Sequence, residues 1–185
     1  MSTTDPLFNV ASVKTRTEAL GPGRRMAIWF QGCDFNCKGC CNPELQPLEP
    51  RHLVRLSEIL RIASVAKEEN GIEGVTLIGG EPTLQASIPA LAEGLQSLGL
   101  GVIMFTGRLF SELDESLTRH LDTVIDGRFE IDNRDTVRNL VGSNNQRIIN
   151  ITNRYADDDW FTELRPDFVE IDLDGETVVS SGSSY

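Results

Sequence analysis

The sequence predicts an α/β fold, namely a single domain built as an open, partial (β/α) barrel of about five or six mostly parallel strands. The first observation is that short apolar runs alternate with longer segments in which apolar residues recur at helical spacing. Such alternation favours right-handed βαβ units. The second observation is length, because 185 residues suit one domain whereas a closed eight-stranded barrel typically needs about 250. The barrel is therefore expected to remain open.

The first half of the chain supplies most of the expected elements. Three short apolar runs are expected to be buried strands, at residues 24–31, 74–78 and 101–105. Residues 51–70 carry apolar side chains at intervals of three and four, so they are expected to form a helix. Residues 85–98 are expected to form a second helix that ends at Gly99 as its C-cap.

The second half is expected to continue this pattern with shorter elements. It begins with a short helix around residues 109–117, and further strands are expected at 122–125, 146–151 and 168–173. We take residues 1–185 as one domain with a core at 19–151 and a C-terminal extension at 152–185.

Within the extension, the acidic run at residues 157–159 is expected to be a helix N-cap and a solvated face. Trp160 and Phe161 are expected to belong to the core, and the polar end at 180–185 to fray.

Charge and cysteine usage narrow the classes of function. The net charge of −11 argues against a protein that binds nucleic acid through its phosphates, because such proteins present a basic face. No apolar run approaches the length of a membrane span, and the first ten residues lack the features of a signal peptide. We therefore expect a cytoplasmic protein without membrane or nucleic-acid partners.

The residues that could bind a metal or a ligand directly follow the expected strands. A cysteine-rich segment follows the first strand, Gly79-Gly80-Glu81-Pro82 follows the second, and Thr106-Gly107 follows the third. In parallel α/β folds, ligands bind at the carboxyl ends of the strands. These three segments are therefore expected to meet at one site.

The four cysteines, Cys33, Cys37, Cys40 and Cys41, indicate a metal centre. They are close neighbours in the sequence and have no distant partner, so a disulfide framework is excluded. Three of them form Cys-x3-Cys-x2-Cys, and three thiolates on a four-iron cluster leave one iron open to a ligand. Gly32 and Gly39 allow a tight backbone path around a bulky cluster. The alternative is a zinc knuckle with Cys41 as fourth ligand, although Cys41 is more simply a plain buried cysteine.

This cysteine pattern, together with the Gly-Gly-Glu-Pro turn, resembles the radical S-adenosylmethionine superfamily. Within it, the chain is similar to the small activating subunits of anaerobic (class III) ribonucleotide reductase, a branch of the glycyl-radical enzyme activases. Four stretches of the sequence carry the likeness, namely 21–24 (GPGR), 37–42 (CKGCCN), 79–82 (GGEP) with 105–107 (FTG), and the pair 126–130 (DGRFE) and 142–147 (GSNNQR).

The resemblance implies a 4Fe–4S cluster held by Cys33, Cys37 and Cys40 and a bound S-adenosylmethionine. The residues that it places against S-adenosylmethionine are Gly39, Gly79, Gly80, Glu81, Thr106, Ser143 and Asn145. The backbone of Gly79 and Gly80 would approach the amino group, with the Glu81 carboxylate nearby. From the residues alone, the turn at 79–82 is also a helix entry with Pro82 at the first helical position, and 142–145 is simply a good turn.

The implied function is that of a radical S-adenosylmethionine oxidoreductase. It would cleave S-adenosylmethionine reductively to a 5′-deoxyadenosyl radical and install a glycyl radical on an anaerobic ribonucleoside-triphosphate reductase. The implied partners are that reductase and a one-electron donor such as flavodoxin or ferredoxin. Two alternatives stay open: a freestanding radical enzyme that modifies a small molecule or a peptide, and a non-catalytic electron carrier or zinc-binding protein.

Overall fold

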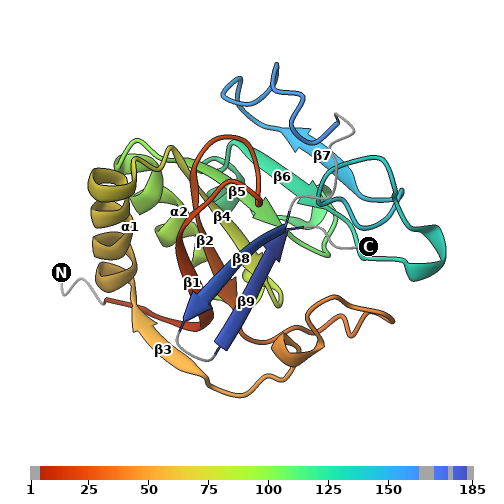
Figure 1. The fold of residues 1–185 in the computed structure, drawn as a ribbon, viewed down its shortest axis with the longest axis horizontal. Coiled ribbons are helices and arrows are strands. Elements are labelled where there is room, and N and C mark those ends of the chain that lie inside the picture. The colour runs from red at the N-terminus through yellow and green to blue at the C-terminus, as the bar shows by residue number, and fades with distance from the viewer. Residues whose placement is uncertain (1–4, 163–168, 175–176, 183–185) are drawn as a thin grey trace.

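The computed structural model describes residues 5–162, 169–174 and 177–182. Its central element is a mixed sheet with the strand order β3-β1-β2-β4-β5-β6-β7 (Figure 1). The inner strands are parallel to one another, and they are β2 (Arg25–Phe30), β4 (Gly74–Gly79), β5 (Gly101–Phe105) and β6 (Thr123–Asp126). Within the described residues the sheet is open, with β3 and β7 at its edges. The α/β class and the parallel centre are confirmed, whereas curvature into a partial barrel stays a prediction.

The N-terminal edge of the sheet differs from the expectation. Strand β1 (Leu7–Thr17), which was not expected, pairs antiparallel with β2. Strand β3 (His52–Arg55) pairs antiparallel with β1, so the prediction of one helix over residues 51–70 is wrong at its start. Apolar residues at 53 and 54 fit a strand as well as a helix, and the pairing with β1 decides between them.

Two helices cover one face of the sheet (Figure 1). Helix α1 (Leu56–Asn70) and helix α2 (Ile88–Ser97) confirm the helices predicted here, although α2 is shorter at both ends than expected. Each buries residues spaced three and four apart, which are Ile59, Ala63 and Ala66 in α1 and Ile88, Leu91, Ala92 and Leu95 in α2. The C-cap is Leu98, one residue before the predicted Gly99, which follows it with a left-handed φ of +77°, and the next N–H, of Leu100, donates to the Leu95 carbonyl.

After β5 the elements become short. The helix expected at 109–117 is instead a 3-10 turn η3 (Phe110–Glu112) and a single helical turn α3 (Glu115–Thr118). They are separated by Leu113, whose ψ of 141° is extended, and by Asp114, whose carboxylate caps the Ser116 N–H. Strand β7 (Arg147–Asn150) is confirmed as a strand, and it runs antiparallel to β6.

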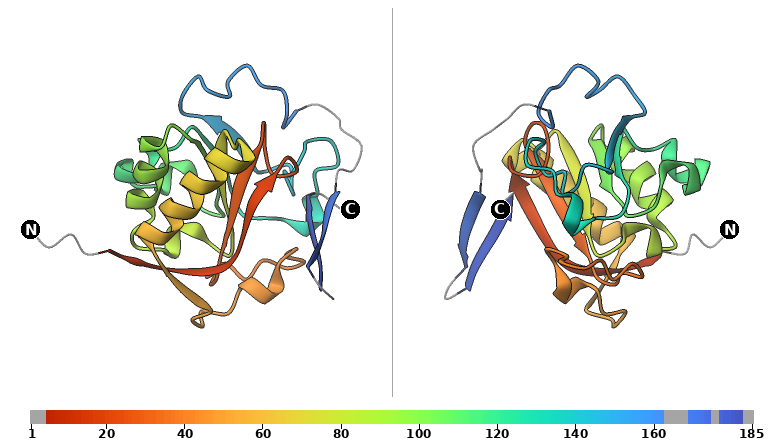
Figure 2. Two further views of the ribbon diagram at one scale, coloured as in Figure 1. Left: turned by 60° about the vertical axis from the view of Figure 1, so that its left-hand side comes forward. Right: turned by 90° about the vertical axis from the view of Figure 1, so that its right-hand side faces the viewer.

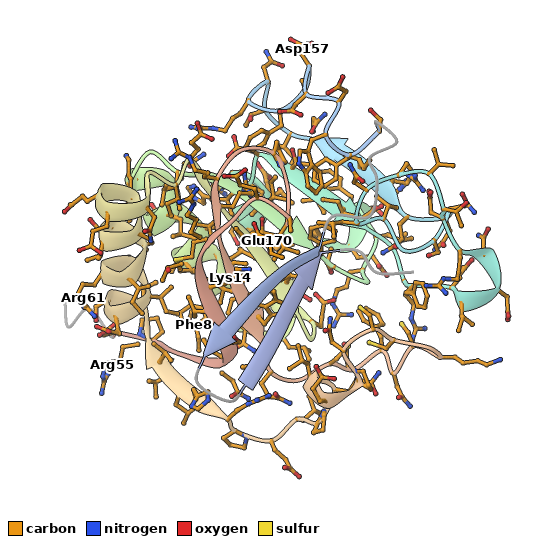
Figure 3. The ribbon with its side chains drawn as sticks, in the orientation of Figure 1. Phe8, Lys14, Arg55, Arg61, Asp157 and Glu170 are labelled. Carbon is orange, nitrogen blue, oxygen red and sulfur yellow. The ribbon has the colours of Figure 1, made fainter. Side chains whose placement is uncertain are left out.

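The face of the sheet away from the helices has its own apolar cluster. Ile103 of β5 and Ile125 of β6 pack there with Trp160 and Phe161, which are both buried. The prediction that these two aromatic residues belong to the core is confirmed. Residues 157–159 are exposed as expected, but they lie in an irregular loop and not at the start of a helix, with Asp157 far out on the loop after β7 (Figure 3).

A buried arginine joins this face to the C-terminal extension. Arg25 is fully buried, and its guanidinium donates to Thr76 Oγ1 at 2.8 Å and to the carbonyls of Pro22, Val75 and Gly101. It also donates to the Tyr155 hydroxyl at 2.8 Å, with its carbon 5.2 Å from the centre of that ring. Burial lowers the pKa of Arg25. Because every donor direction is used, the charge is tolerated inside the fold.

The described end of the chain is a hairpin of β8 (Val169–Asp174) and β9 (Thr177–Gly182), paired antiparallel. It lies on the side of the sheet opposite to the helices (Figure 2). The strand predicted at 168–173 is confirmed apart from residue 168, which lies outside the described residues. Residues 180–182 belong to β9 and not to a frayed tail, while 183–185 lie outside the described residues. In the described part of the chain, no helix is long and apolar enough to cross a membrane.

One carboxylate of the hairpin contacts the body of the protein. Glu170 accepts hydrogen bonds from Lys14 Nζ at 2.7 Å, from Thr17 Oγ1 at 2.6 Å and from the Glu18 N–H at 2.8 Å (Figure 3). Burial raises the pKa of Glu170, but these donors more than offset it, so its pKa is lowered from the ordinary value. The ionised carboxylate is thus the form that docks the hairpin.

This contact predicts a pH-dependent docking of the hairpin. A carboxylate whose pKa is lowered by docking stabilises the docked state above its ordinary pKa, and that stabilisation is lost as the pH falls through the lowered value. We expect the β8–β9 amides in nitrogen–proton NMR spectra to keep their docked positions at pH 7 and to leave them below about pH 4. Glu170→Gln should release the hairpin already at pH 7.

The matched control is Glu18→Gln, which removes the same charge from an exposed carboxylate that pairs with the exposed Arg16. It should leave the hairpin signals in place. The amides of β4 and β5 report on global unfolding. Hairpin signals that do not respond to Glu170→Gln would show that other contacts dock the hairpin.

Candidate cluster-binding site

The cysteines lie on a loop that is closed at its base. The loop leaves the end of β2, and it returns through the 3-10 turn η1 (Pro43–Leu45). The Gly32 N–H donates to the Leu45 carbonyl at 2.8 Å, and the Cys33 N–H donates to the Gln46 carbonyl at 3.0 Å. These bonds fix both ends of the loop beside the sheet, so all four cysteines project from one short closed segment.

The four thiols differ in exposure. All of them are free, and Cys33, Cys37 and Cys40 are partly buried, whereas Cys41 is exposed. The expectation that Cys41 is a plain buried cysteine is therefore wrong. The side-chain amide of Asn42 donates to the Cys41 sulfur at 3.3 Å.

The chemistry of these donors fits an iron–sulfur cluster. Three free thiols on one loop are the soft ligands that such clusters use. In the described residues, no three His, Cys, Asp or Glu side chains already converge at metal-binding distances. The side-chain oxygen of Gln31, two residues before Cys33, is buried without a hydrogen-bond partner in the described residues. The loop thus carries three soft ligands, with an unused buried acceptor just before it.

The acidity of the thiols varies along the loop. The pKa of Cys33 is raised, mainly by burial. The backbone N–H groups of Phe35 and Asn36 lower it in part, while the nearby Glu81 and Cys37 raise it. A hydrogen bond with Cys41 lowers the pKa of Cys40 to about 6, and the same bond raises the pKa of Cys41. Cys40 is therefore the thiolate of this pair, as a metal ligand requires.

The two glycines at the end of β4, Gly79 and Gly80, pack directly against the base of the cysteine loop. The Gly80 N–H donates to the Phe30 carbonyl and the Glu81 N–H donates to the Gly32 carbonyl, both at 2.8 Å. A Cβ on Gly80 would lie 2.1 Å from the Gly32 carbonyl oxygen, and one on Gly79 would lie 2.5 Å from the Phe30 nitrogen. The structure therefore gives these glycines a packing role beside the ligand contact that the resemblance implies.

Glu81 connects the ends of β4 and β5. It is buried, and its Oε1 accepts from the Thr83 N–H, from Thr83 Oγ1 at 2.6 Å and from Thr106 Oγ1 at 2.8 Å. Its Oε2 accepts from the Gly107 N–H at 2.9 Å. The structure thus brings the predicted residues Glu81 and Thr106 together. Pro82 begins the 3-10 turn η2 (Pro82–Leu84), so the predicted helix entry is confirmed as a 3-10 entry.

Ser143 and Asn145 stabilise the long segment between β6 and β7. Ser143 is buried, and its hydroxyl accepts from the Glu130 N–H at 3.1 Å. The Asn145 amide donates to the Arg128 carbonyl at 2.8 Å. These bonds set the shape of the segment, and contact of either residue with S-adenosylmethionine stays a prediction.

The segment between β6 and β7 reaches the cysteine loop at Gly39. A Cβ on Gly39, whose φ is +74°, would lie 2.2 Å from Ile131 Cδ1 in the 3-10 turn η4 (Ile131–Asn133). A cavity of about 350 Å³ opens here, lined by Lys38 and residues 129–133. The three predicted segments and this fourth one therefore meet around the cysteines.

Sequence reasoning did not single out two groups of residues on the strands and loops of this region. Trp29, Ile78 and Phe105 are partly buried on neighbouring strands, on the face opposite to the core side chains of Ile28, Leu77 and Met104. Strand alternation could have indicated this row. The second group is Phe35 with Arg108 and Arg128, which no spacing in the sequence connects.

The comparisons with known proteins agree with this site. Residues 19–149, well over half of the chain, match a family described as a 4Fe-4S single cluster domain. The fold and the cysteine loop thus define an iron–sulfur protein of the α/β class.

The similar proteins narrow this class. The anaerobic ribonucleoside-triphosphate reductase-activating protein of Vibrio cholerae is 30% identical over 141 residues, which cover 71% of this chain and 91% of that protein. The protein of the same name from Enterobacteria phage T4 is 26% identical over 69% of this chain and 85% of its own length. The pyruvate formate-lyase-activating enzyme of Staphylococcus aureus (strain USA300) is 30% identical over 79% of this chain and 62% of that enzyme. The chain therefore belongs to the activase branch of the radical S-adenosylmethionine family, as the resemblance predicted.

Proposed function

We propose that this enzyme binds a 4Fe–4S cluster through Cys33, Cys37 and Cys40, cleaves S-adenosylmethionine and installs a glycyl radical on an anaerobic ribonucleoside-triphosphate reductase. The observation that carries the proposal is the loop itself. Its three partly buried free thiols lie on a segment closed against the Gly80–Glu81 turn. The exposed Cys41 is left outside the ligand set, so one iron would remain for S-adenosylmethionine.

A cluster held by Cys33, Cys37 and Cys40 and reduced by a donor such as flavodoxin or ferredoxin would supply one electron for the reductive cleavage of S-adenosylmethionine to methionine and a 5′-deoxyadenosyl radical, and this radical would take a hydrogen atom from the target glycine. The chain's own residues would bind and orient the reactants. Gly39, Gly79 and Gly80 let the backbone approach S-adenosylmethionine closely. Glu81 would place Thr106 and add negative charge near the methionyl amine, while Ser143 and Asn145 would shape the opposite wall.

We prefer the reductase as the protein target because this chain spans more of the relatives named for the reductase than of the relative named for pyruvate formate-lyase. The chain spans 91% and 85% of the two relatives named for the reductase, but 62% of the relative named for pyruvate formate-lyase. We also infer that residues 1–185 form one domain in the cytoplasm, in which residues 152–185 extend the core at 19–151. Tyr155, Trp160 and Phe161 support this inference because they pack on the sheet of the core.

The test is a reconstitution under anaerobic conditions. The cluster-loaded protein is mixed with reduced flavodoxin, S-adenosylmethionine and the anaerobic reductase of the same organism. We expect a glycyl-radical doublet by electron paramagnetic resonance, formed only when all components are present. Because the splitting comes from the α-hydrogen of glycine, the doublet should collapse when the reductase contains α-deuterated glycine.

A reductase in which the radical glycine is replaced by alanine is the matched control and should give no doublet. A protein that forms 5′-deoxyadenosine with a small molecule or a peptide, yet never produces the doublet on the reductase, would refute the target but not the radical chemistry.

A further inference from the structure

We propose that Arg108 and Arg128 are positioning residues that hold the cysteine loop through their contacts with Phe35, which together are called the grip. Phe35 lies between Cys33 and Cys37 in the sequence, so a grip on this one ring orients both thiols. The inference rests on the proposed function in one respect, because it takes these cysteines as cluster ligands.

The grip consists of two cation–π contacts with the same ring. The central guanidinium carbon of Arg108 lies 5.0 Å from the centre of the Phe35 ring, and that of Arg128 lies 4.7 Å from it. The ring also lies against the backbone of Gly107, where a Cβ would come within 2.6 Å of two ring carbons. Gly107 therefore leaves the space that the ring occupies.

Each arginine also holds the loop by hydrogen bonds. Arg108 donates to the Asp34 carboxylate at 2.8 Å, and Arg128 donates to the Phe35 carbonyl at 2.6 Å. The loop is thus held at a side chain, at a ring and at a backbone group within two consecutive residues. Bonds of guanidinium to carboxylate are stronger than bonds between neutral groups.

Hydrogen bonds link both arginines of the grip to the rest of the site. Arg108 Nε donates to Thr83 Oγ1 at 2.9 Å, and this hydroxyl donates in turn to the buried carboxylate of Glu81. On the other side, the Arg128 carbonyl accepts from the Asn145 amide. The segments after β5 and β6 therefore both contact Phe35, and the segment after β4 is linked to it through Arg108.

This arrangement has a measurable consequence for cluster retention. Because Phe35 and the two arginines are partly or fully exposed, the two cation–π contacts together should change the opening equilibrium of the loop by roughly tenfold, which corresponds to about 1.4 kcal/mol. Loss of the two cation–π contacts should raise the rate at which a chelator removes the cluster by about the same factor as it raises the opening equilibrium, because the chelator reaches iron when the loop opens. The fold should be unaffected, since Phe35 belongs to neither apolar core cluster of the described residues.

The experiment measures cluster loss to a chelator, followed by absorbance, in the anaerobically reconstituted protein. Phe35→Leu, R108Q and R128Q should each lose the cluster several-fold to tenfold faster than the unchanged protein, and Phe35→Tyr should restore the slow rate. Arg61→Gln is the matched control, because Arg61 is an exposed arginine of α1 that pairs with Glu58.

A second measurement does not depend on the cluster. Amide hydrogen exchange of residues 33–40 in the apoprotein should speed up in the same three variants, with unchanged thermal unfolding. Unchanged exchange rates and unchanged rates of cluster loss would refute the proposal that the arginine contacts with Phe35 position the cysteine loop. A failure of the unchanged protein to take up any cluster would instead refute the proposed function, and the exchange measurement would still test the grip.

Discussion

Replacing Cys33, Cys37 or Cys40 with alanine is expected to reduce the bound iron from about four atoms per chain to nearly none. Replacing Cys41 with alanine should leave the iron content unchanged. Three thiolates on one loop are the smallest set that holds a four-iron cluster with an open iron, so none of the three can be spared. The measurement is the iron and sulfide content, with the absorbance spectrum, after anaerobic reconstitution.

The four variants control for one another, because each removes one sulfur from the same closed loop. Circular dichroism of the apoproteins should be unchanged, since none of the four thiols belongs to the buried core of the described residues. A full cluster in Cys37→Ala would overturn the ligand assignment. Loss of the metal in Cys41→Ala would favour four protein ligands, which is the arrangement of a carrier or a zinc site.

Gly80→Val is expected to abolish cluster uptake by displacing the cysteine loop from the sheet. A Cβ at this position would lie 2.1 Å from the Gly32 carbonyl oxygen and 3.0 Å from that of Leu45, and both are backbone atoms at the base of the loop. Relief requires the backbone to move, and overpacking of this kind costs about 1–3 kcal/mol. The N–H bonds of Glu81 and Gly32 across this contact should be lost with it.

The effect is measured as the iron content and as the thermal unfolding midpoint of the apoprotein. Gly94→Ala is the control, because its added Cβ would meet only the flexible end of Leu60, 2.7 Å away, on the helical side of the sheet. It should keep the cluster, and a helix interior favours alanine over glycine. Uptake of a full cluster by Gly80→Val with merely weaker S-adenosylmethionine binding would show that Gly80 serves the ligand and not the loop.

The local pattern of the sequence was sufficient for the inner part of the fold. Strands β2, β4 and β5 are short apolar runs ended by glycine or polar residues, and their order along the chain places three site segments at one edge. The first turn of the helix expected at 51–70 was wrong because Leu53 and Val54 satisfy either period. Only the partner strand β1, distant in sequence, could decide it.

The cysteine motif was also readable from the sequence, because spacing along one loop is a local property. The exposure of Cys41 was not, since burial depends on what packs over the loop. The same holds for Glu170, whose three donors lie in β1 and just after it, more than 150 positions away in the chain.

The sequence by itself determined the α/β class and the family of this protein and predicted its ligand set, because short-range spacing and the order of strands carry that information. Only the tertiary structure decided that Gly80 packs on the cysteine loop, that Glu81 links β4 to β5, and that two arginines contact the ring of Phe35. These contacts join residues from four different strand ends. Strand order predicts that such ends lie close together, but which side chains touch is set by the packing of loops that have no regular period.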